Sequence, residues 1–476
     1  MEQRSVAASP IELADEQLAF FRWGRAGGKV AITNDAGDWA LLSEAELADL
    51  LAGRISDSQP RFAELQRKGF LRDGLDVDGL VQRIARRNRH ISRGPHLHVL
   101  TLDGPSGPMA HEVLERIVDL ALESASQSLT FDLQASTGEP LRQWDLVRAA
   151  VETARSRNQQ SAGKTLAFRV FSNLSAMTDA TASWLIDNQI RLAVDLDGPA
   201  NLHDAQRNGG ASHADTVRWI EHFHQAQAQA AKDEPGSSVE ACVNVSSATL
   251  AAPQAVLDEY ERLGLPLVAL RPARSGAPAA ESYLSFHRAL LEDLRGRNRR
   301  GSGLAEQLAA VIATKILTAD DPGAVDLQSP NGAGTNELSY ASDGTAFPCD
   351  LARQLAVAGD AMFALGNVRS LSLPDILRHP TVRAIAAASL LDLQPATATA
   401  WEKPFIGMSP VAHYAAQGDL FGQPSRCFEC RLHRAVTNQL FEWLAEDGGD
   451  AAEILGRWVV SGSSLAVSRR ASSDMV

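Results

Sequence analysis

Cysteine is scarce in this sequence. The 476 residues contain only four, Cys242, Cys349, Cys427 and Cys430. A disulfide framework in a chain of this size would need more cysteines at closer spacing. We therefore expect four reduced thiols.

Long basic blocks and long apolar runs are also absent. The formal net charge is -13, and no cluster of basic residues offers a surface for nucleic acid or for an anionic membrane. No stretch reaches the roughly 20 apolar residues of a membrane span. The first residues, MEQRSVAASPIELADEQ, are polar and acidic where a secretory signal would be basic and then apolar. We expect a cytoplasmic protein without nucleic-acid or membrane partners.

Between residues 95 and 295 the hydrophobic pattern alternates between two periods. Short apolar or β-branched runs predict strands, and apolar residues three or four positions apart predict helices between them. The six predicted strands are His96–Leu102, Ser128–Ala135, Thr165–Asn173, Ile190–Gly198, Ser238–Ser246 and Leu265–Pro272. This alternation predicts an α/β fold with a parallel sheet. Six units are too few for a closed eightfold barrel, which leaves a partial barrel or a doubly wound sheet.

The pattern of residues 15–78 predicts a small α+β unit. Two strand-like runs flank a turn at residues 34–37, and a helix is predicted over Leu41–Leu51. Ser43 and Glu46 have the spacing of a capping box for that helix. We interpret the unit as a winged-helix-like module.

The C-terminal part is richer in loops. Residues 295–303, RGRNRRGSG, have the composition of a mobile basic linker and precede a further unit at 300–445. Helical patterns recur in that unit, with a stretch full of Gly, Asp, Pro and Ser between them. Residues 446–476 are expected to form a C-terminal tail.

Short sequence phrases, taken in their order along the chain, resemble those of a known family. The phrases are NDAGDWALLSEAELADLLAG, LQRKGFLRD, GPHLHVLTL, GEPLRQWDLVRAAVE, SNLSAMTDATASWLIDNQIRLAVDLDGPANLHDAQR, VDLQSPNGAG, DGTAFPCDLARQLAVAGDAMFALGNV and PVAHYAAQGDLFG. In them the chain resembles the radical-SAM maturases of the His-Xaa-Ser peptide-modification system, which have a SPASM-type C-terminal extension. The resemblance implies a partial six-stranded βα barrel at 95–295, a SPASM-like extension at 300–445, and a peptide-recognition module at 15–78.

One loop that the resemblance requires is missing. After the first strand such enzymes carry CxxxCxxC, whose three thiolates hold a 4Fe-4S cluster and leave one iron open to SAM. Here residues 103–109 read DGPSGPM and lead directly into the next helix. The loop is deleted rather than changed at one position. We therefore expect no 4Fe-4S cluster and no SAM cleavage, so the chain would be a degenerate member.

The C-terminal extension also lacks the cysteines of an auxiliary cluster. The stretch before the PVAHYAAQGD phrase reads TATAWEKPFIGMS. Cys427 and Cys430 form a CxxC with His433 close behind, which is a weak zinc signature because a second pair of ligands should be visible. We expect no metal there and favour a buried thiol pair. Cys349 is interpreted as a small buried apolar residue.

Part of the SAM-contacting site that the resemblance implies is retained. Its residues follow the ends of predicted strands, where ligands of parallel sheets bind. They are Gly138, Glu139, Pro140, Ser172, Asn173, Asp195 and Asp197. Thr137 replaces the first glycine of the GGEP motif of relatives. Without the open iron we expect at most weak SAM binding, and the simpler interpretation is that these are turn and helix-cap residues.

We therefore predict a pseudoenzyme that serves as a binding or scaffolding subunit in the maturation of a ribosomally made peptide. Its expected partners are a precursor peptide, an active radical-SAM maturase, or both. The N-terminal module would capture the peptide as an added strand on a sheet edge, unless it is only a structural cap. The alternative is an enzyme with cluster-independent acid–base chemistry at the barrel mouth. Candidates for that chemistry are Glu139, Asp195, Asp197, His203, Asp204 and Arg207.

Overall fold

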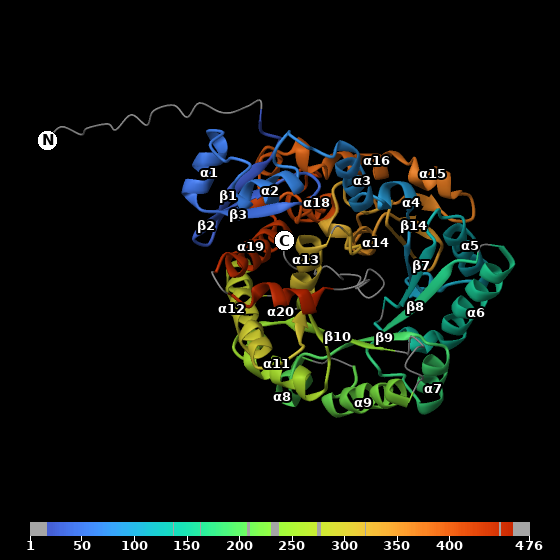
Figure 1. Cartoon of the computed structure of the whole chain (residues 1–476). Helices are drawn as coiled ribbons and strands as arrows, with labels where there is room; N and C mark the ends of the chain where they lie inside the picture. Colours follow the sequence, from blue (N-terminus) through green and yellow to red (C-terminus); the bar gives the residue numbers. More distant parts are fainter. Residues whose placement is uncertain are drawn as a thin grey trace.

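The computed structural model describes residues 17–136, 138–161, 163–206, 210–229, 238–273, 278–318, 320–446 and 449–459. These segments form a mixed α/β protein with one large, mainly parallel sheet and a separate three-stranded sheet near the N-terminus (Figure 1). None of the helices in the described segments is both long enough and apolar enough to cross a membrane.

The N-terminal module is an antiparallel sheet followed by helices. Its strands are β1 (Arg22–Ala26), β2 (Lys29–Thr33) and β3 (Trp39–Leu42), paired in that order, and its helices are α1 (Glu44–Leu51), α2 (Pro60–Arg67), α3 (Val77–Arg87) and α4 (His90–Arg93). The predicted capping box is confirmed: Ser43 Oγ accepts from the Glu46 backbone N–H, and the Glu46 carboxylate accepts from the Ser43 N–H. Because this cap fixes the first turn, α1 begins at Glu44 and not at Leu41.

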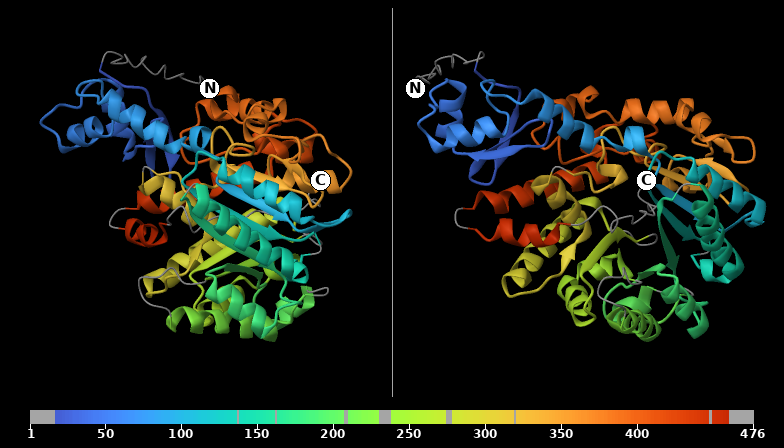
Figure 2. Two further views of the ribbon diagram at one scale, coloured as in Figure 1. Left: turned by 90° about the vertical axis from the view of Figure 1, so that its right-hand side faces the viewer. Right: turned by 45° about the vertical axis from the view of Figure 1, so that its right-hand side comes forward.

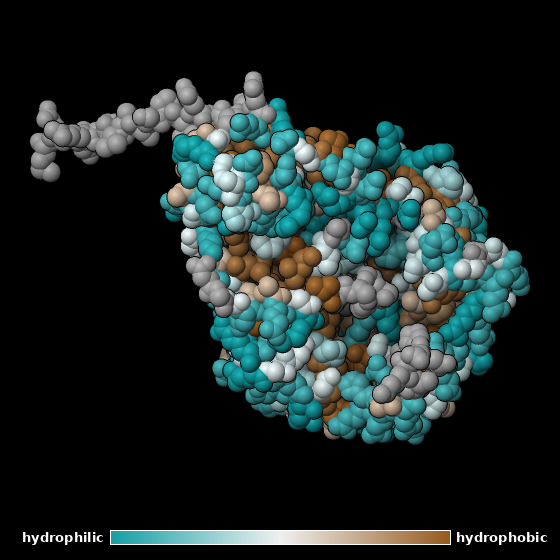
Figure 3. Space-filling view, in the orientation of Figure 1, coloured by the Kyte–Doolittle hydropathy of each residue, from teal (hydrophilic) through white to brown (hydrophobic). Residues whose placement is uncertain are grey.

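The two faces of this small sheet are buried against different partners, because alternate strand residues point to opposite sides. Ile32 and Leu65 belong to a small core that α1 and α2 close. On the other face Trp39 packs edge-on against Phe441, with 5.3 Å between ring centroids, and donates its indole N–H to the Ile316 carbonyl at 2.8 Å. Figure 2 shows the module beside the C-terminal helices in both views, and Figure 3 shows apolar residues gathered beneath it. The N-terminal module therefore packs against the C-terminal helices that contain Ile316 and Phe441.

The central sheet contains all six predicted strands. They are β4 (Leu97–Thr101), β7 (Ser128–Gln134), β8 (Thr165–Ser172), β9 (Arg191–Asp195), β10 (Val239–Val245) and β11 (Leu267–Pro272), and each is parallel to the next. Their order in the sheet follows their order in the chain, with no reversal among them. Among these six strands there is no reversal of order of the kind found in a doubly wound sheet.

Helices lie along the outside of the curved sheet (Figure 1). They are α5 (His111–Leu122), α6 (Trp144–Ser161), α7 (Asp179–Asp187), α8 (Ala200–Gln206), α9 (His213–Gln229), α10 (Ser247–Leu250) and α11 (Pro253–Arg262). Under them the outward strand residues are apolar and buried, as Leu133, Val170 and Val194 show. The opposite, inner face is polar. Its strands contribute Asp132, Gln134, Arg169, Arg191, Asp195, Glu240, Asn244 and Arg271.

The C-terminal part extends both edges of this sheet. β12 (Ala305–Glu306) pairs with β11. At the other edge β13 (Glu337–Tyr340) runs parallel to β4, followed by antiparallel β14 (Thr345–Phe347) and β15 (Gly366–Asn367). The sequence suggested a loop-rich stretch here, with a strand-turn segment only at FPCDLAR, which begins at Phe347 of β14. These strands are two to four residues long and pair with one another or with a distant segment, so they leave little periodic signal.

The remaining helices follow β11 in the chain. They are α12 (Ala280–Arg299), α13 (Gln307–Leu317), α14 (Asp350–Val357), α15 (Leu373–Leu377), α16 (Pro380–Ala388), α17 (Pro395–Ala398), α18 (Pro410–Gln417), α19 (Phe428–Ala445) and α20 (Ala451–Trp458). The last of these lies inside the range predicted as a tail and buries Trp458 to 2% exposure. Residues 460–476 of that range lie outside the described residues.

The basic stretch at 295–303 is not a linker, which corrects the prediction from composition. Its first half completes α12, and Arg295 is only 3% exposed. The Arg295 guanidinium pairs with Glu446 at 2.7 Å and with Asp450 at 2.9 Å. Acidic residues that are distant in sequence therefore neutralise a run that looks like a solvated linker.

Candidate functional site

The loop after β4 is a tight hairpin. Its strands β5 (Asp103–Gly104) and β6 (Gly107–Pro108) pair antiparallel. The hairpin contains no cysteine, and the first cysteine of the sequence is Cys242 on β10. A SAM-binding 4Fe-4S cluster needs three thiolates, one on each of three irons, so that the fourth iron stays open. The residues at this position do not fit such a cluster.

Glu139 lies between the C-terminal ends of β7 and β8 and is 1% exposed. Both of its carboxylate oxygens lie 2.9 Å from Ser172 Oγ, and one accepts the Leu141 backbone N–H at 3.0 Å. Burial raises the pKa of Glu139, while hydrogen bonds from Leu141, Ser172 and the backbone N–H groups of Ala176 and Ser175 oppose that rise. The carboxylate therefore ties the two loops together.

The other predicted residues of this edge lie beside Glu139. The Gly138 carbonyl accepts the Asn173 N–H at 3.2 Å, and Pro140 begins a short 3-10 turn, Pro140–Gln143. Gly138 has φ of 84°, a left-handed conformation that favours glycine. Thr137 lies outside the described residues. The structure thus brings the predicted residues of β7 and β8 together as one loop assembly.

Asp195 and Asp197 belong to a polar network at the ends of β9, β10 and β11. Arg271 pairs with Asp195, and its Nε donates to Asn244 Oδ1 at 2.8 Å. Asn244 donates its backbone and side-chain N–H groups to Asp197 Oδ1 at 2.7 and 2.9 Å. The Arg271 guanidinium also lies 5.0 Å from the centroid of the Phe171 ring. Both predicted carboxylates are thus engaged by neighbouring strands.

A second charged group on the inner face was missed by sequence reasoning. Arg169 has a fully buried side chain and pairs with Asp132, which is also fully buried. Arg169 contacts Glu240 at 3.3 Å, and Glu240 contacts Arg191 at 3.2 Å. The available signal was a charged residue inside an otherwise apolar strand run on β7, β8 and β10. These pairs join four neighbouring strands.

The acid–base candidates on α8 hold loops together. His203 is buried, and its Nδ1 accepts the Asp197 backbone N–H at 3.2 Å. Asp204 accepts the backbone N–H of His213, the first residue of α9, at 2.7 Å. Arg207 lies outside the described residues. His203 and Asp204 therefore both accept backbone N–H groups of neighbouring segments.

Cys427 and Cys430 are buried at the start of α19. The third residue beside them is His413 of α18, whose Nε2 lies 3.3 Å from Cys430 Sγ. The ligand atoms of these three residues all lie within 4.8 Å of one another. His433, which the sequence placed with the cysteines, is outside this group and has its Nδ1 3.4 Å from the Gly407 carbonyl.

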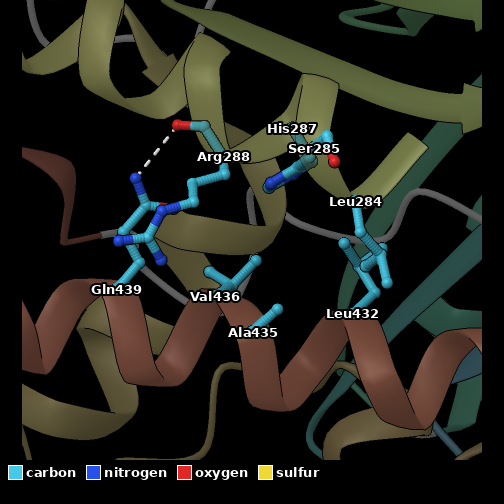
Figure 4. A pocket seen from close by; sticks show the side chains of 8 residues that line it. All are labelled: Leu284, Ser285, His287, Arg288, Leu432, Ala435, Val436 and Gln439. Carbon is cyan, nitrogen blue, oxygen red and sulfur yellow. Dashed lines mark hydrogen bonds between the residues drawn. The ribbon is translucent and has the colours of Figure 1, made fainter. Parts of the chain in front are cut away.

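A pocket lies between α12 and α19 (Figure 4). It is lined by Leu284, Ser285, His287, Arg288, Leu432, Ala435, Val436 and Gln439. Gln439 donates its side-chain N–H to the Arg288 carbonyl at 3.0 Å, and His287 Nε2 lies 3.4 Å from a carboxylate oxygen of Glu306. These polar groups contact the protein itself, and the other walls are largely apolar. Ser285 and His287 both line the pocket, but no hydrogen bond joins them among the residues that the structure describes.

α3 presents an apolar stripe to solvent. Val77 and Val81 lie one turn apart and are 56% and 57% exposed. Leu80 and Ile84 beside them are half-buried, and the helix has no fully buried residue. An amphipathic helix normally covers such a stripe with a partner.

No family model and no curated protein matches this sequence. Solved structures share its fold. One is anSMEcpe with bound AdoMet, with a TM-score of 0.61 and 14% identity over 76% of this chain and 99% of that chain. Another is SuiB of Streptococcus suis, with a TM-score of 0.52 and 13% identity over 87% of this chain and 99% of that chain. A structure of SuiB bound to precursor peptide SuiA has a TM-score of 0.50 and 12% identity, with the same coverage.

These similarities show that the chain has the fold of anSMEcpe and SuiB. At such low identity they establish the fold and nothing further.

Proposed function

We propose that this chain is a cluster-free, radical-SAM-like binding or scaffolding subunit that holds a ribosomally made precursor peptide beside an active maturase of the His-Xaa-Ser system. In this proposal the six central strands form a partial βα barrel. Residues 15–78 are a winged-helix-like peptide-recognition module, and residues 300–445 are a degenerate SPASM-like extension. A radical-SAM/SPASM-type fold without cysteines in the loop that follows its first barrel strand, β4, supports this combination.

The observation that carries the proposal is the apolar stripe of α3 beside a strand edge. Among the described strands, β3 pairs with β2 on one side only. Arg83 of α3 bonds to Asp38, the residue before β3, at 3.0 Å, so the helix lies next to the start of that strand. A free edge binds an extended peptide through its backbone groups, and Val77 and Val81 offer apolar contacts to alternate side chains of that peptide.

The stripe itself sets the peptide chemistry. Arg83 pairs with Asp38, and Arg87 donates to two backbone carbonyls, so these two charges already have partners within the protein. The exposed stripe of Val77 and Val81 favours an extended segment with apolar side chains. A protein of the same fold, SuiB, has been solved with a precursor peptide bound.

The alternative, cluster-independent chemistry at the strand ends, has less support. Its described candidates Glu139, Asp195 and Asp197 already have hydrogen-bond or ion-pair partners within the protein. A general base must be able to reach a substrate proton. We therefore favour binding, and we propose that the residual strand-end loops bind SAM weakly at most.

Fluorescence anisotropy with the full-length chain tests the proposal. The probes are synthetic, labelled peptides that correspond to the short reading frames beside this gene, and a co-expressed neighbouring maturase is tested by pulldown. We expect at least one peptide to bind, and Val81→Asp to weaken that binding at least tenfold because it places a charge in the apolar contact.

Val357→Asp is the matched control. Val357 is also 57% exposed and ends α14, far along the chain from α3. It should leave peptide affinity unchanged. Failure of every peptide and maturase to bind, or equal weakening by the two variants, contradicts the proposal.

A further inference from the structure

The start of α19 and the middle of α18 bring three metal-ligating side chains together. His413, Cys427 and Cys430 are 0%, 1% and 4% exposed. Their ligand atoms lie within 4.8 Å of one another, and His413 Nε2 lies 3.3 Å from Cys430 Sγ. In a tetrahedral zinc site, Zn–S and Zn–N bonds place the ligand atoms roughly 3.5 to 3.8 Å apart. The His413–Cys430 pair is already near this spacing, and the other two pairs lie within 4.8 Å.

The helix geometry explains why the two thiols face the same point. Cys427 is the N-cap of α19, and Cys430 lies in the first turn of that 18-residue helix. Residues three apart lie on the same side of a helix. The N-terminal end of a helix also stabilises negative charge, which favours the thiolates that bind a metal.

The loop after α18 holds the His413 ring in position. His413 Nδ1 lies 2.8 Å from the Phe421 carbonyl, so a proton on Nδ1 leaves the lone pair of Nε2 directed toward Cys430. Metal-binding histidines are usually oriented by this kind of second hydrogen bond. Gly422 packs against the ring, since a Cβ there would lie 2.7 Å from His413 Cγ.

The two thiols lie in apolar surroundings. Leu391, Ile406 and Met408 form an apolar cluster with them.

We propose that His413, Cys427 and Cys430 hold one zinc ion in a structural site that joins α18 to α19. The carboxylate of Glu429 completes the tetrahedron as the fourth protein ligand, since Glu429 Oε2 lies 3.3 Å from Cys427 Sγ. His433 is not a ligand. The site is independent of the proposed peptide binding, so either proposal can fail alone.

Metal content of the full-length chain is the first test. The protein is purified under reducing conditions without a polyhistidine tag, and zinc is measured by mass spectrometry. We expect about one zinc per chain, as in structural sites of this ligand type. His413→Ala and Cys430→Ala should each lower zinc content at least tenfold. Cys349→Ala is the control, because Cys349 is equally buried but lies in a different core cluster.

Cobalt binding keeps the proposal testable if a variant folds poorly. The metal-free wild-type chain is titrated with Co²⁺ while absorption is recorded. We expect thiolate-to-cobalt charge transfer and the visible bands of a tetrahedral site. Gly422→Ala should weaken Co²⁺ binding at least tenfold with an unchanged circular dichroism spectrum. The added Cβ meets the His413 ring, and the left-handed φ of 54° at this position strains only the loop that orients that ring.

Four results would overturn the zinc site. They are a reduced wild-type chain that binds neither metal, an unchanged cobalt spectrum in Cys430→Ala, a Cys427–Cys430 disulfide in freshly purified protein, and stoichiometric acid-labile sulfide that depends on these cysteines.

Discussion

Ser172 Oγ lies 2.9 Å from both carboxylate oxygens of Glu139. This contact joins the loop after β7 to the end of β8 without involving any ligand. The same carboxylate accepts the backbone N–H of Leu141 at 3.0 Å. A residue pair that could meet a substrate at the sheet edge is therefore engaged in holding that edge together.

Ser172→Ala should lower the free energy of unfolding by about 1 to 3 kcal/mol, because it removes a donor from a buried acceptor. Urea denaturation of the two proteins measures this difference. Ser175→Ala is the control, since Ser175 is exposed and its backbone N–H, which the substitution retains, is what contacts the carboxylate. Equal stability of wild type and Ser172→Ala would show that the contact does not hold the loops.

Asp132 and Arg169 on the inner face should behave as a coupled pair. Asp132→Leu alone leaves the buried Arg169 with only a longer contact to Glu240, and it should cost about 3 to 5 kcal/mol of stability. Arg169→Met in the same chain should recover part of this loss, because Arg191 still pairs with Glu240. A double-mutant cycle by denaturation measures the coupling. Additive costs would contradict a structural ion pair.

The pH dependence of stability should report Glu337 of β13. Burial raises the pKa of Glu337 to about 8, and its carboxylate accepts the Asp350 backbone N–H at 2.8 Å. The folded state therefore holds this proton more tightly than the unfolded state. The stability gained from the neutral form is complete below the unfolded pKa, near 4.5, and is lost as pH rises toward about 8.

We therefore expect wild type to lose stability relative to Glu337→Gln by up to about 1.4 kcal/mol per pH unit within that window. Urea titrations of both proteins at pH 5.5, 6.5 and 7.5 measure the difference. Using the difference cancels the titration of other groups. A difference that stays constant across the three pH values would mean that Glu337 is ionised in the folded chain.

The six central strands could be predicted because their apolar runs are local signals, repeated with helices between them. Contacts between distant segments could not be predicted. Arg295 looks like a linker residue in the sequence, yet Glu446 and Asp450 bury and neutralise it. The short strands β13 to β15 likewise depend on partners that are distant or that give no periodic signal.

In the candidate site, too, the positions of residues on strands could be predicted, whereas their contacts with distant residues could not. The strand-end positions of Glu139 and Asp197 followed from the strand pattern, but their partners Ser172 and Asn244 follow from the order of strands in the sheet. Sequence proximity suggested His433 as the neighbour of the cysteines. The chain instead folds back after α18, which brings His413 to Cys430.

The most direct test of the account is anaerobic reconstitution of the full-length chain with iron and sulfide, followed by reduction in the presence of SAM. Acid-labile sulfide and 5'-deoxyadenosine are the two readouts, because iron alone could occupy a mononuclear site. The account predicts that both stay at background. About four sulfides per chain together with 5'-deoxyadenosine would show a 4Fe-4S cluster that cleaves SAM, and would contradict a cluster-free binding subunit.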